Sequence, residues 1–478
     1  MELRPSTSLT DLQNRLYSGE LSVQKVLSEA IVALDQNAHL GPFLEDFRGE
    51  CQEQAEKIDQ KIASGNAGKL AGLILGIKDV FAYGGHPLTA GSKILKGFKS
   101  QFTGTALQRL IDADALIIGR QNCDEFAMGS SNENSAYGPV RNAIAPDRVP
   151  GGSSGGSAVA IQAGMCQASL ATDTGGSIRQ PAAFCGLVGL KPTYSRVSRN
   201  GLIAYGSSFD CVGPLTRNVA DAALILEVMA GPDPKDPTCS SKPNEPFFSG
   251  PAYSKPRTIA YWEPTLTSDS IQPEIREALA RTLVDLQELG HKVLPVQLPY
   301  LDYVLPTYYI LTTCEASSNL SRYDGMHFGH RTQVPGNLEE TLKRSRSEGF
   351  GPEVRRRILL GTFALSADFH EAFFSKAQKV RRLIQNSALD VFQKYDFLLM
   401  PTTPTTAFPL GSRIKDPMEM YLADIFTVWA NLAGVPAISL PCGKDAKGLP
   451  IGLQFHAGHF QEKTMLDFAR ELEIKFSF

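Results

Sequence analysis

The sequence predicts an α/β protein, and three observations lead to this expectation. Short apolar stretches with strand character alternate with segments whose apolar residues recur at helical spacing, which is typical of an α/β sheet. Of the 478 residues, 42% are hydrophobic and 20% are charged, which is the composition of a globular protein. This length allows either about three domains of roughly 150 residues or one large α/β domain.

The first elements are expected to be two helices followed by alternating strands and helices. Residues 8–11 (SLTD) form a capping box that begins a short helix, and Ser22 caps a longer helix that runs to about Leu34. Residues 51–65 are polar and favour a helix. The next elements in order are a strand at 73–77 ending at Lys78, a helix at 105–113 and a strand at 115–118.

Seven prolines fall between Pro232 and Pro256, a density that excludes a helix or a central strand. We expect an exposed connection there, and it divides the chain into N-terminal helices (1–60), a first half (61–231), the connection (232–256) and a second half (257–478). In the second half the sequence predicts strands at 258–261, 291–298, 397–400, 437–440 and 452–455, and helices at 273–289, 377–394, 461–475 and over most of 300–375.

Composition excludes several classes of protein. With 47 lysines and arginines against 50 aspartates and glutamates, the net charge is −3, which argues against nucleic-acid binding through bulk charge. The N-terminus has no apolar core after Arg4 that would suggest a secretory signal, and the longest uncharged run, residues 149–172, is too rich in Gly, Ser, Gln and Thr to span a membrane. The eight cysteines include no C-x-x-C pair. We therefore expect a cytoplasmic protein with reduced thiols and no membrane association.

The glycines concentrate in two serine-containing segments. Residues 151–157 (GGSSGGS) could be a flexible linker or a phosphate loop. However, an apolar, helix-prone stretch follows directly, and the lysine that a phosphate loop requires is missing. We therefore favour a catalytic loop that carries a serine. Residues 173–179 (DTGGSIR) could hold an oxyanion beside a nucleophilic hydroxyl, because two glycines let backbone N–H groups converge.

A nucleophilic serine needs a base, and the residues alone leave its identity open. None of the eight histidines lies in these two segments, although the fold could bring one there. Lys78, at the end of an apolar strand, is the other candidate, but from the residues alone an ordinary solvated lysine is the more typical interpretation. To act as a base near pH 7, its pKa must fall by about 3 units, or roughly 4 kcal/mol, which burial can supply.

Two further patterns have simpler explanations. The pairs His327/His330 and His456/His459 could bind a metal, but no Cys or carboxylate set completes either pair, and we expect no metal site. The basic stretch at 343–357 could contact RNA, although a solvated face or a contact with a protein partner is the more typical role.

Taken together, the motifs resemble the amidase signature family. The resemblance rests on residues 76–79 (GIKD), 150–157 (PGGSSGGS) and 173–181 (DTGGSIRQP). Residues 122–133 (NCDEFAMGSSNE), 421–424 (YLAD) and 431–436 (NLAGVP) are similar to one branch of that family, the A subunits of glutamyl-tRNA(Gln)/aspartyl-tRNA(Asn) amidotransferases. The match runs over about residues 8–470. It implies the amidase signature fold, one large domain with a mixed, twisted central β-sheet covered by helices on both faces.

The resemblance also implies the site residues. Ser177 would be the nucleophile, Ser153 a bridging serine after a cis peptide bond, and Lys78 the base. The oxyanion would be bound by the N–H groups of Thr174, Gly175, Gly176 and Ser177. Arg357 would bind the carboxylate of glutamine, Asp424 its amino group, and Tyr308, or its neighbour Tyr309, would line the pocket.

The implied function is that of a glutaminase that supplies ammonia for converting Glu-tRNA(Gln), and possibly Asp-tRNA(Asn), to the amidated form. The expected heterotrimer contains a tRNA-binding B subunit, which would also bind ATP and Mg²⁺, and a small C subunit. We expect no cofactor on this chain and contact with tRNA mainly through the partner. The alternatives are a free-standing amidase for aryl or fatty amides and a nucleotide-binding or structural subunit with an inert serine loop.

Overall fold

The computed structural model describes residues 8–247, 255–334, 336–413 and 417–476, and these form a mixed sheet of eleven strands. The strand order is β1-β3-β2-β4-β6-β5-β10-β11-β9-β7-β8. The strands are β1 (Phe43–Asp46), β2 (Ile74–Lys78), β3 (Leu116–Gln121), β4 (Ala168–Asp173), β5 (Val188–Lys191), β6 (Cys211–Thr216), β7 (Thr258–Trp262), β8 (Lys292–Val296), β9 (Phe397–Pro401), β10 (Ala437–Lys444) and β11 (Pro450–Ala457).

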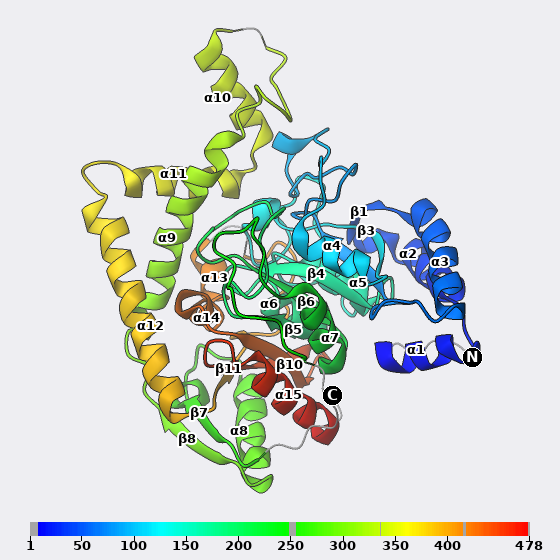
Figure 1. Ribbon diagram of the computed structural model, residues 1–478. Coiled ribbons are helices and arrows are strands. Elements are labelled where there is room, and N and C mark those ends of the chain that lie inside the picture. Colours follow the sequence, from blue (N-terminus) through cyan, green and yellow to red (C-terminus); the bar gives the residue numbers. More distant parts are fainter. Residues whose placement is uncertain (1–7, 248–254, 335, 414–416, 477–478) are drawn as a thin grey trace.

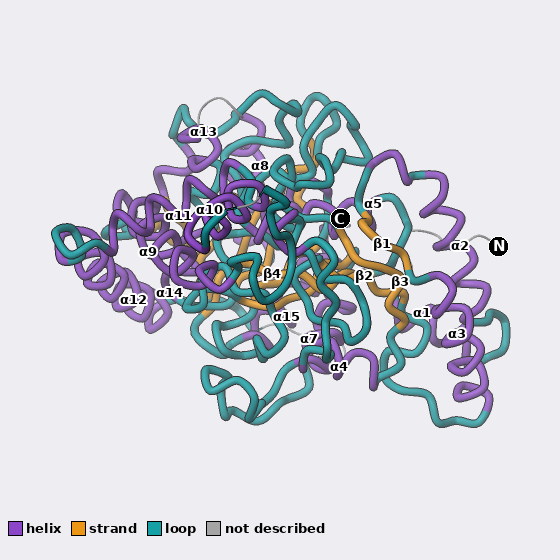
Figure 2. Tube along the Cα trace, turned by 90° about the horizontal axis from the view of Figure 1, so that it is seen from above, coloured by secondary structure: helices purple, strands orange, loops and turns teal. Residues whose placement is uncertain are grey.

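Helices cover both faces of this sheet. They are α1 (Leu9–Tyr17), α2 (Val23–Gln36), α3 (Arg48–Ala63), α4 (Thr105–Asp112), α5 (Gly155–Gln162), α6 (Arg179–Cys185), α7 (Val219–Met229), α8 (Pro273–Glu288), α9 (Val304–Asn319), α10 (Leu338–Gly349), α11 (Pro352–Leu365), α12 (Lys376–Lys394), α13 (Pro417–Leu422), α14 (Val428–Ala433) and α15 (Glu462–Phe476). Figure 2 shows α5 and α8 on one side of the strands and α4 and α7 on the other.

Both halves of the chain contribute to this one sheet, and they meet at its centre. Strands β1–β6 occupy one side and β7–β11 the other, and β5 pairs with β10 through Gly189 and Ser439. The short helix α6, which follows the second serine segment, packs against β5, β10 and β11. The expected fold class, a single large α/β domain with a mixed sheet, is therefore confirmed.

Most elements expected from the sequence are present, with shifts of a few residues at their ends. Four strands, β1, β4, β5 and β6, were not predicted. Strands β4, β5 and β6 are buried on both faces and lack the alternating pattern of a half-exposed strand, whereas β1 is a half-buried edge strand of only four residues. In the proline-rich connection, residues 232–247 and 255–256 form no helix or strand, while 248–254 lie outside the described residues.

The helices of the second half form a layer that extends beyond the sheet. Helices α9 and α12 pack along one edge of the molecule, and α10 projects from it (Figure 1). Helix α11 packs closely on α9 because Gly361 has no side chain. A Cβ at this position would overlap with the carbonyl group of Thr313. Among the helices that the structure describes, none is both long and apolar enough to cross a membrane.

Candidate active site

Lys78 ends strand β2 in the interior of the protein, with 0% of its surface exposed. Its Nζ donates hydrogen bonds to three hydroxyl oxygens: Ser153 Oγ at 2.7 Å, Ser154 Oγ at 2.9 Å and Thr172 Oγ1 at 3.0 Å. Burial lowers the pKa of Lys78 to about 8, and the nearby carboxyl groups oppose this effect only in part. Lys78 is therefore not a solvated lysine, and part of it is neutral near pH 7.

Ser153 lies on the loop that leads from residue 150 into α5. The Gly152–Ser153 peptide bond is cis. The loop is held on two sides: Gly152 N donates to Gln180 Oε1 at 2.9 Å, and Asp124 N donates to the carbonyl oxygen of Ser153 at 3.2 Å. A Cβ at Gly152 would overlap with the Asp124 carboxylate, so glycine is required at this position. These contacts place the Ser153 hydroxyl against Lys78.

Ser177 lies on the turn between β4 and α6, and the buried carboxylate of Asp173 organises this turn. Asp173 accepts the N–H groups of Gly176 and Ile178, at 2.9 and 3.3 Å, and pairs with the guanidinium of Arg179, with two N–O distances of 3.0 Å. Burial raises the pKa of Asp173, but Arg179 outweighs that effect and holds it at about 2. Asp173 is therefore a fixed anion that shapes the serine turn.

Ser177 is 7% exposed. Among the described residues the Ser177 hydroxyl makes no hydrogen bond, while the Ser153 hydroxyl accepts one from Lys78. Of the four predicted oxyanion donors, Gly176 already donates its N–H to Asp173. Gly176 has φ +124°, a conformation that favours glycine, and a Cβ at Gly175 would overlap with the hydroxyl of Tyr308.

Arg357 comes from α11 in the second half of the chain and is 3% exposed. Its Nε donates to Glu353 Oε1 at 2.8 Å, and its Nη1 donates to the Tyr205 hydroxyl at 2.6 Å. The guanidinium also lies 5.5 Å from the ring centre of Tyr309 and 5.7 Å from that of Tyr421. These contacts hold a buried cation in one orientation.

Asp424 follows α13 and lies on the other side of Tyr309. Its Oδ2 accepts hydrogen bonds from Ser130 Oγ at 2.7 Å and from the Tyr309 hydroxyl at 3.0 Å, and its Oδ1 lies 3.5 Å from Gln180 Nε2. Burial raises the pKa of Asp424 to about 7, and the hydrogen bonds from Ser130 and Tyr309 oppose the rise. Gln180 thus touches both the Ser153 loop and Asp424.

Tyr308 and Tyr309 both belong to the site. Tyr308 is buried on α9, and its hydroxyl faces Gly175 in the turn that carries Ser177. Tyr309 connects Arg357 to Asp424, a role that the sequence analysis did not assign to it. Ser130 and Gln180 were not predicted, although both lie within the motifs at 122–133 and 173–181. Glu353 and Tyr205 were not predicted either, and the sequence offered no signal for them.

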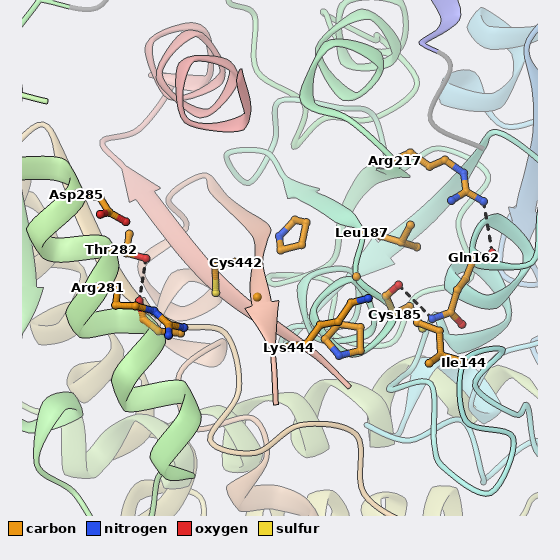
Figure 3. Close-up of a pocket in the computed structure, with 15 residues that line it drawn as sticks. Ile144, Gln162, Cys185, Leu187, Arg217, Arg281, Thr282, Asp285, Cys442 and Lys444 are labelled. Atoms are coloured by element: carbon orange, nitrogen blue, oxygen red, sulfur yellow. Dashed lines mark hydrogen bonds between the residues drawn. The ribbon is translucent and has the colours of Figure 1, made fainter. Parts of the chain in front are cut away.

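A separate cavity of about 800 Å³ lies between α8, the end of β10, the start of β11 and the end of α6 (Figure 3). Arg217, Arg281 and Lys444 are among the residues that line it. It contains none of the residues named above, so it is not part of the candidate active site.

Both histidine pairs have protein partners in the described part of the chain. His456 Nδ1 lies 3.0 Å from the carbonyl oxygen of Leu398, and His459 Nε2 lies 3.1 Å from that of Ala433. His327 and His330 each lie beside a carboxylate. Among the described residues, no group of three or more His, Cys, Asp or Glu side chains is arranged to hold a metal ion.

Known proteins share this fold and sequence over nearly the full chain. The chain is 48% identical over 459 residues to the A subunit of glutamyl-tRNA(Gln) amidotransferase from Acidobacterium capsulatum, covering 95% of this chain and 96% of that protein. The crystal structure of the A subunit of glutamyl-tRNA(Gln) amidotransferase from Thermotoga maritima matches with a TM-score of 0.80 and 37% identity, covering 99% and 96% of the two chains. The peptide amidase of Stenotrophomonas maltophilia matches with a TM-score of 0.81 and 27% identity, covering 98% and 97%.

The family model described as amidase matches residues 25–466, which include every candidate site residue. This match and the sequence identity to the relatives above establish the family of the chain. The chain belongs to the amidase family.

Proposed function

We propose that this chain is the glutamine-hydrolysing A subunit of a tRNA-dependent amidotransferase. The observation that carries the proposal is the buried pair formed by Arg357 and Asp424, which Tyr309 connects beside the serine turns. A cation and an anion held apart in this way suit the carboxylate and the ammonium group of an amino acid. An aryl or fatty amide carries neither group, so this pair favours glutamine over the free-standing amidase alternative.

In the proposed reaction, neutral Lys78 accepts the proton of Ser153, and Ser153 accepts the proton of Ser177 as Ser177 Oγ attacks the side-chain amide of glutamine. The N–H groups of Thr174, Gly175 and Ser177 bind the developing oxyanion, and Gly176 supports them through Asp173. The protonated Lys78 returns the proton through Ser153 to the leaving nitrogen, which departs as ammonia. Water then hydrolyses the glutamyl ester on Ser177.

The pocket residues would fix the orientation of glutamine. Arg357 binds the α-carboxylate through its guanidinium fork, and ionised Asp424 binds the α-ammonium group. Tyr308 closes the side of the pocket next to Gly175. This orientation would present the side-chain amide, and not the α-carboxylate, to Ser177.

The names of the relatives imply a complex of several subunits. We propose that the ammonia passes to a tRNA-binding B subunit that activates the tRNA-bound glutamate with ATP and Mg²⁺, and that a small C subunit binds this chain. The net charge of −3 fits a protein that leaves tRNA binding mainly to its partner. Such a complex would act in the cytoplasm.

Replacing Ser177 by alanine tests the proposal. We expect Ser177→Ala to lower glutamine-dependent ammonia release by at least about 10³-fold, since the covalent intermediate cannot form. A glutamine-derived electrophile should label Ser177 in the native chain, which mass spectrometry would detect. Unchanged activity in the variant, with no adduct, would show that the serine turn is inert. Hydrolysis of an aryl amide that exceeds hydrolysis of glutamine would favour the free-standing amidase.

A further inference from the structure

A buried carboxylate outside the proposed reaction holds the junction between α10 and α11. Glu125 lies in the loop after β3 and is 2% exposed. Its Oε2 accepts the backbone N–H of Gly351, the residue before α11, at 2.8 Å, and its Oε1 accepts the Ser92 hydroxyl. Ser92 Oγ also lies 3.2 Å from the carbonyl oxygen of Gly349. Glu125 and Ser92 therefore bind both ends of this junction.

The junction fits closely around Glu125. A Cβ at Gly351 would overlap with the Glu125 carboxylate, and a Cβ at Gly349 would press on the side chain of Ile94. Phe350, between these two glycines, packs against Phe126, with ring centres 5.6 Å apart. The start of α11 therefore has little freedom to move relative to this loop.

The residue before Glu125 holds the serine loop. Asp124 N donates to the carbonyl oxygen of Ser153, and its carboxylate accepts the N–H groups of Asn132 and Asn134 at 2.9 and 3.1 Å. Two consecutive residues thus bind the catalytic loop on one side and the start of α11 on the other. Helix α11 carries Arg357 on its buried face. Figure 1 shows α11 as part of the helical layer outside the sheet.

We propose that Glu125 is a positioning residue that sets α11, and with it Arg357, at the distance from the serine loop that glutamine requires. The inference rests on the proposed function, and Glu125 itself touches no substrate. A guanidinium fork binds a carboxylate well only in a narrow geometry, so a small displacement of α11 weakens glutamine binding. The groups that transfer protons lie at the end of β2 and on the two serine-containing segments, and they keep their positions.

The test measures the steady-state kinetics of glutamine hydrolysis with the full chain and whatever subunits copurify with it. We expect Glu125→Ala to raise KM for glutamine about tenfold and to change kcat less than twofold. Glu125→Gln should restore KM to within about threefold, because its amide oxygen can still accept the Gly351 N–H. A purely structural role would reduce the amount of folded enzyme, which lowers apparent kcat and leaves KM unchanged.

A matched control exists at the other end of the molecule. Glu473 on α15 accepts the N–H of Val219 at the start of α7, at 3.0 Å, and therefore holds a helix N-terminus in the same way. Glu473→Ala should leave KM unchanged. If Glu125→Ala does not fold, Gly351→Ala replaces it, since its Cβ pushes α11 away from Glu125 and should also raise KM.

An unchanged KM in Glu125→Ala or in its replacement, or an equal rise in Glu473→Ala, overturns this inference. Failure of the proposed function would look different, because the unmodified chain would then not hydrolyse glutamine at all.

Discussion

The two halves of the chain contribute different parts of the candidate site. The first half supplies Lys78, Ser153 and Ser177 from strand ends and glycine turns at the centre of the protein. The second half supplies Arg357 from α11, Asp424 from the end of α13 and Tyr308 from α9, all outside the sheet. The proposed proton-transfer groups depend on backbone geometry, while the proposed recognition groups depend on how the helices pack. Chemistry and recognition should therefore respond differently to substitution.

The largest effect is expected at Lys78, in the first half. Lys78→Ala should lower kcat by about 10³-fold or more, with a small change in KM. In the unmodified chain, kcat should rise with pH up to about 8, because the neutral base forms as Lys78 loses its proton at its lowered pKa. Ser154→Ala removes a neighbouring hydroxyl but keeps the proposed proton path, so its loss should be far smaller. A kcat that does not change between pH 6 and 9 would contradict the assignment.

The next largest effect is expected at Arg357, in the second half. Arg357→Lys keeps the charge but loses the fork, so KM for glutamine should rise at least about tenfold while kcat changes little. Arg355→Lys is the matched control, since Arg355 is exposed on the same helix. Steady-state kinetics on both variants would separate them. A fall in kcat at constant KM would contradict the assignment of substrate recognition to the second half of the chain.

A smaller, pH-dependent effect is expected at Asp424. Burial raises its pKa to about 7, and only the ionised form can bind an ammonium group. KM for glutamine should therefore be lowest above pH 7 and should rise about tenfold for each unit below it. In Asp424→Asn the KM should be high and independent of pH over this range. A KM that falls on acidification would rule out this role for the carboxylate.

The smallest effect is expected at Tyr309, which connects the two recognition groups. Tyr309→Phe removes one hydrogen bond to Asp424 but keeps the ring next to Arg357, so KM should rise about threefold. The same substitution should also raise the pKa of Asp424 further, which moves the pH dependence of KM upwards. An unchanged pH profile would show that the Tyr309 hydroxyl does not influence the pKa of Asp424.

The motifs indicated the residues of the proposed catalytic half more clearly than those of the proposed recognition half. Glycine is required in both serine segments, 151–157 and 173–179, because the backbone passes close to Asp124, Tyr308 and Thr427. The sequence reveals this requirement as clusters of glycine next to serine. Arg357 is one of three consecutive arginines, and no local pattern separates it from its neighbours. Arg357 is the buried one because α11 packs on α9 and its guanidinium lies against Tyr205 and Tyr309.

Local patterns in the sequence predicted the α/β class, most of the elements and the two serine turns, because periodicity and glycine requirements are local properties of the chain. The remaining features arise from long-range packing. This packing joined the halves through β5 and β10, buried Lys78 enough to lower its pKa, and placed Tyr309 between Arg357 and Asp424. These features depend on burial and on contacts between residues far apart in the chain, and neither is encoded in any single segment.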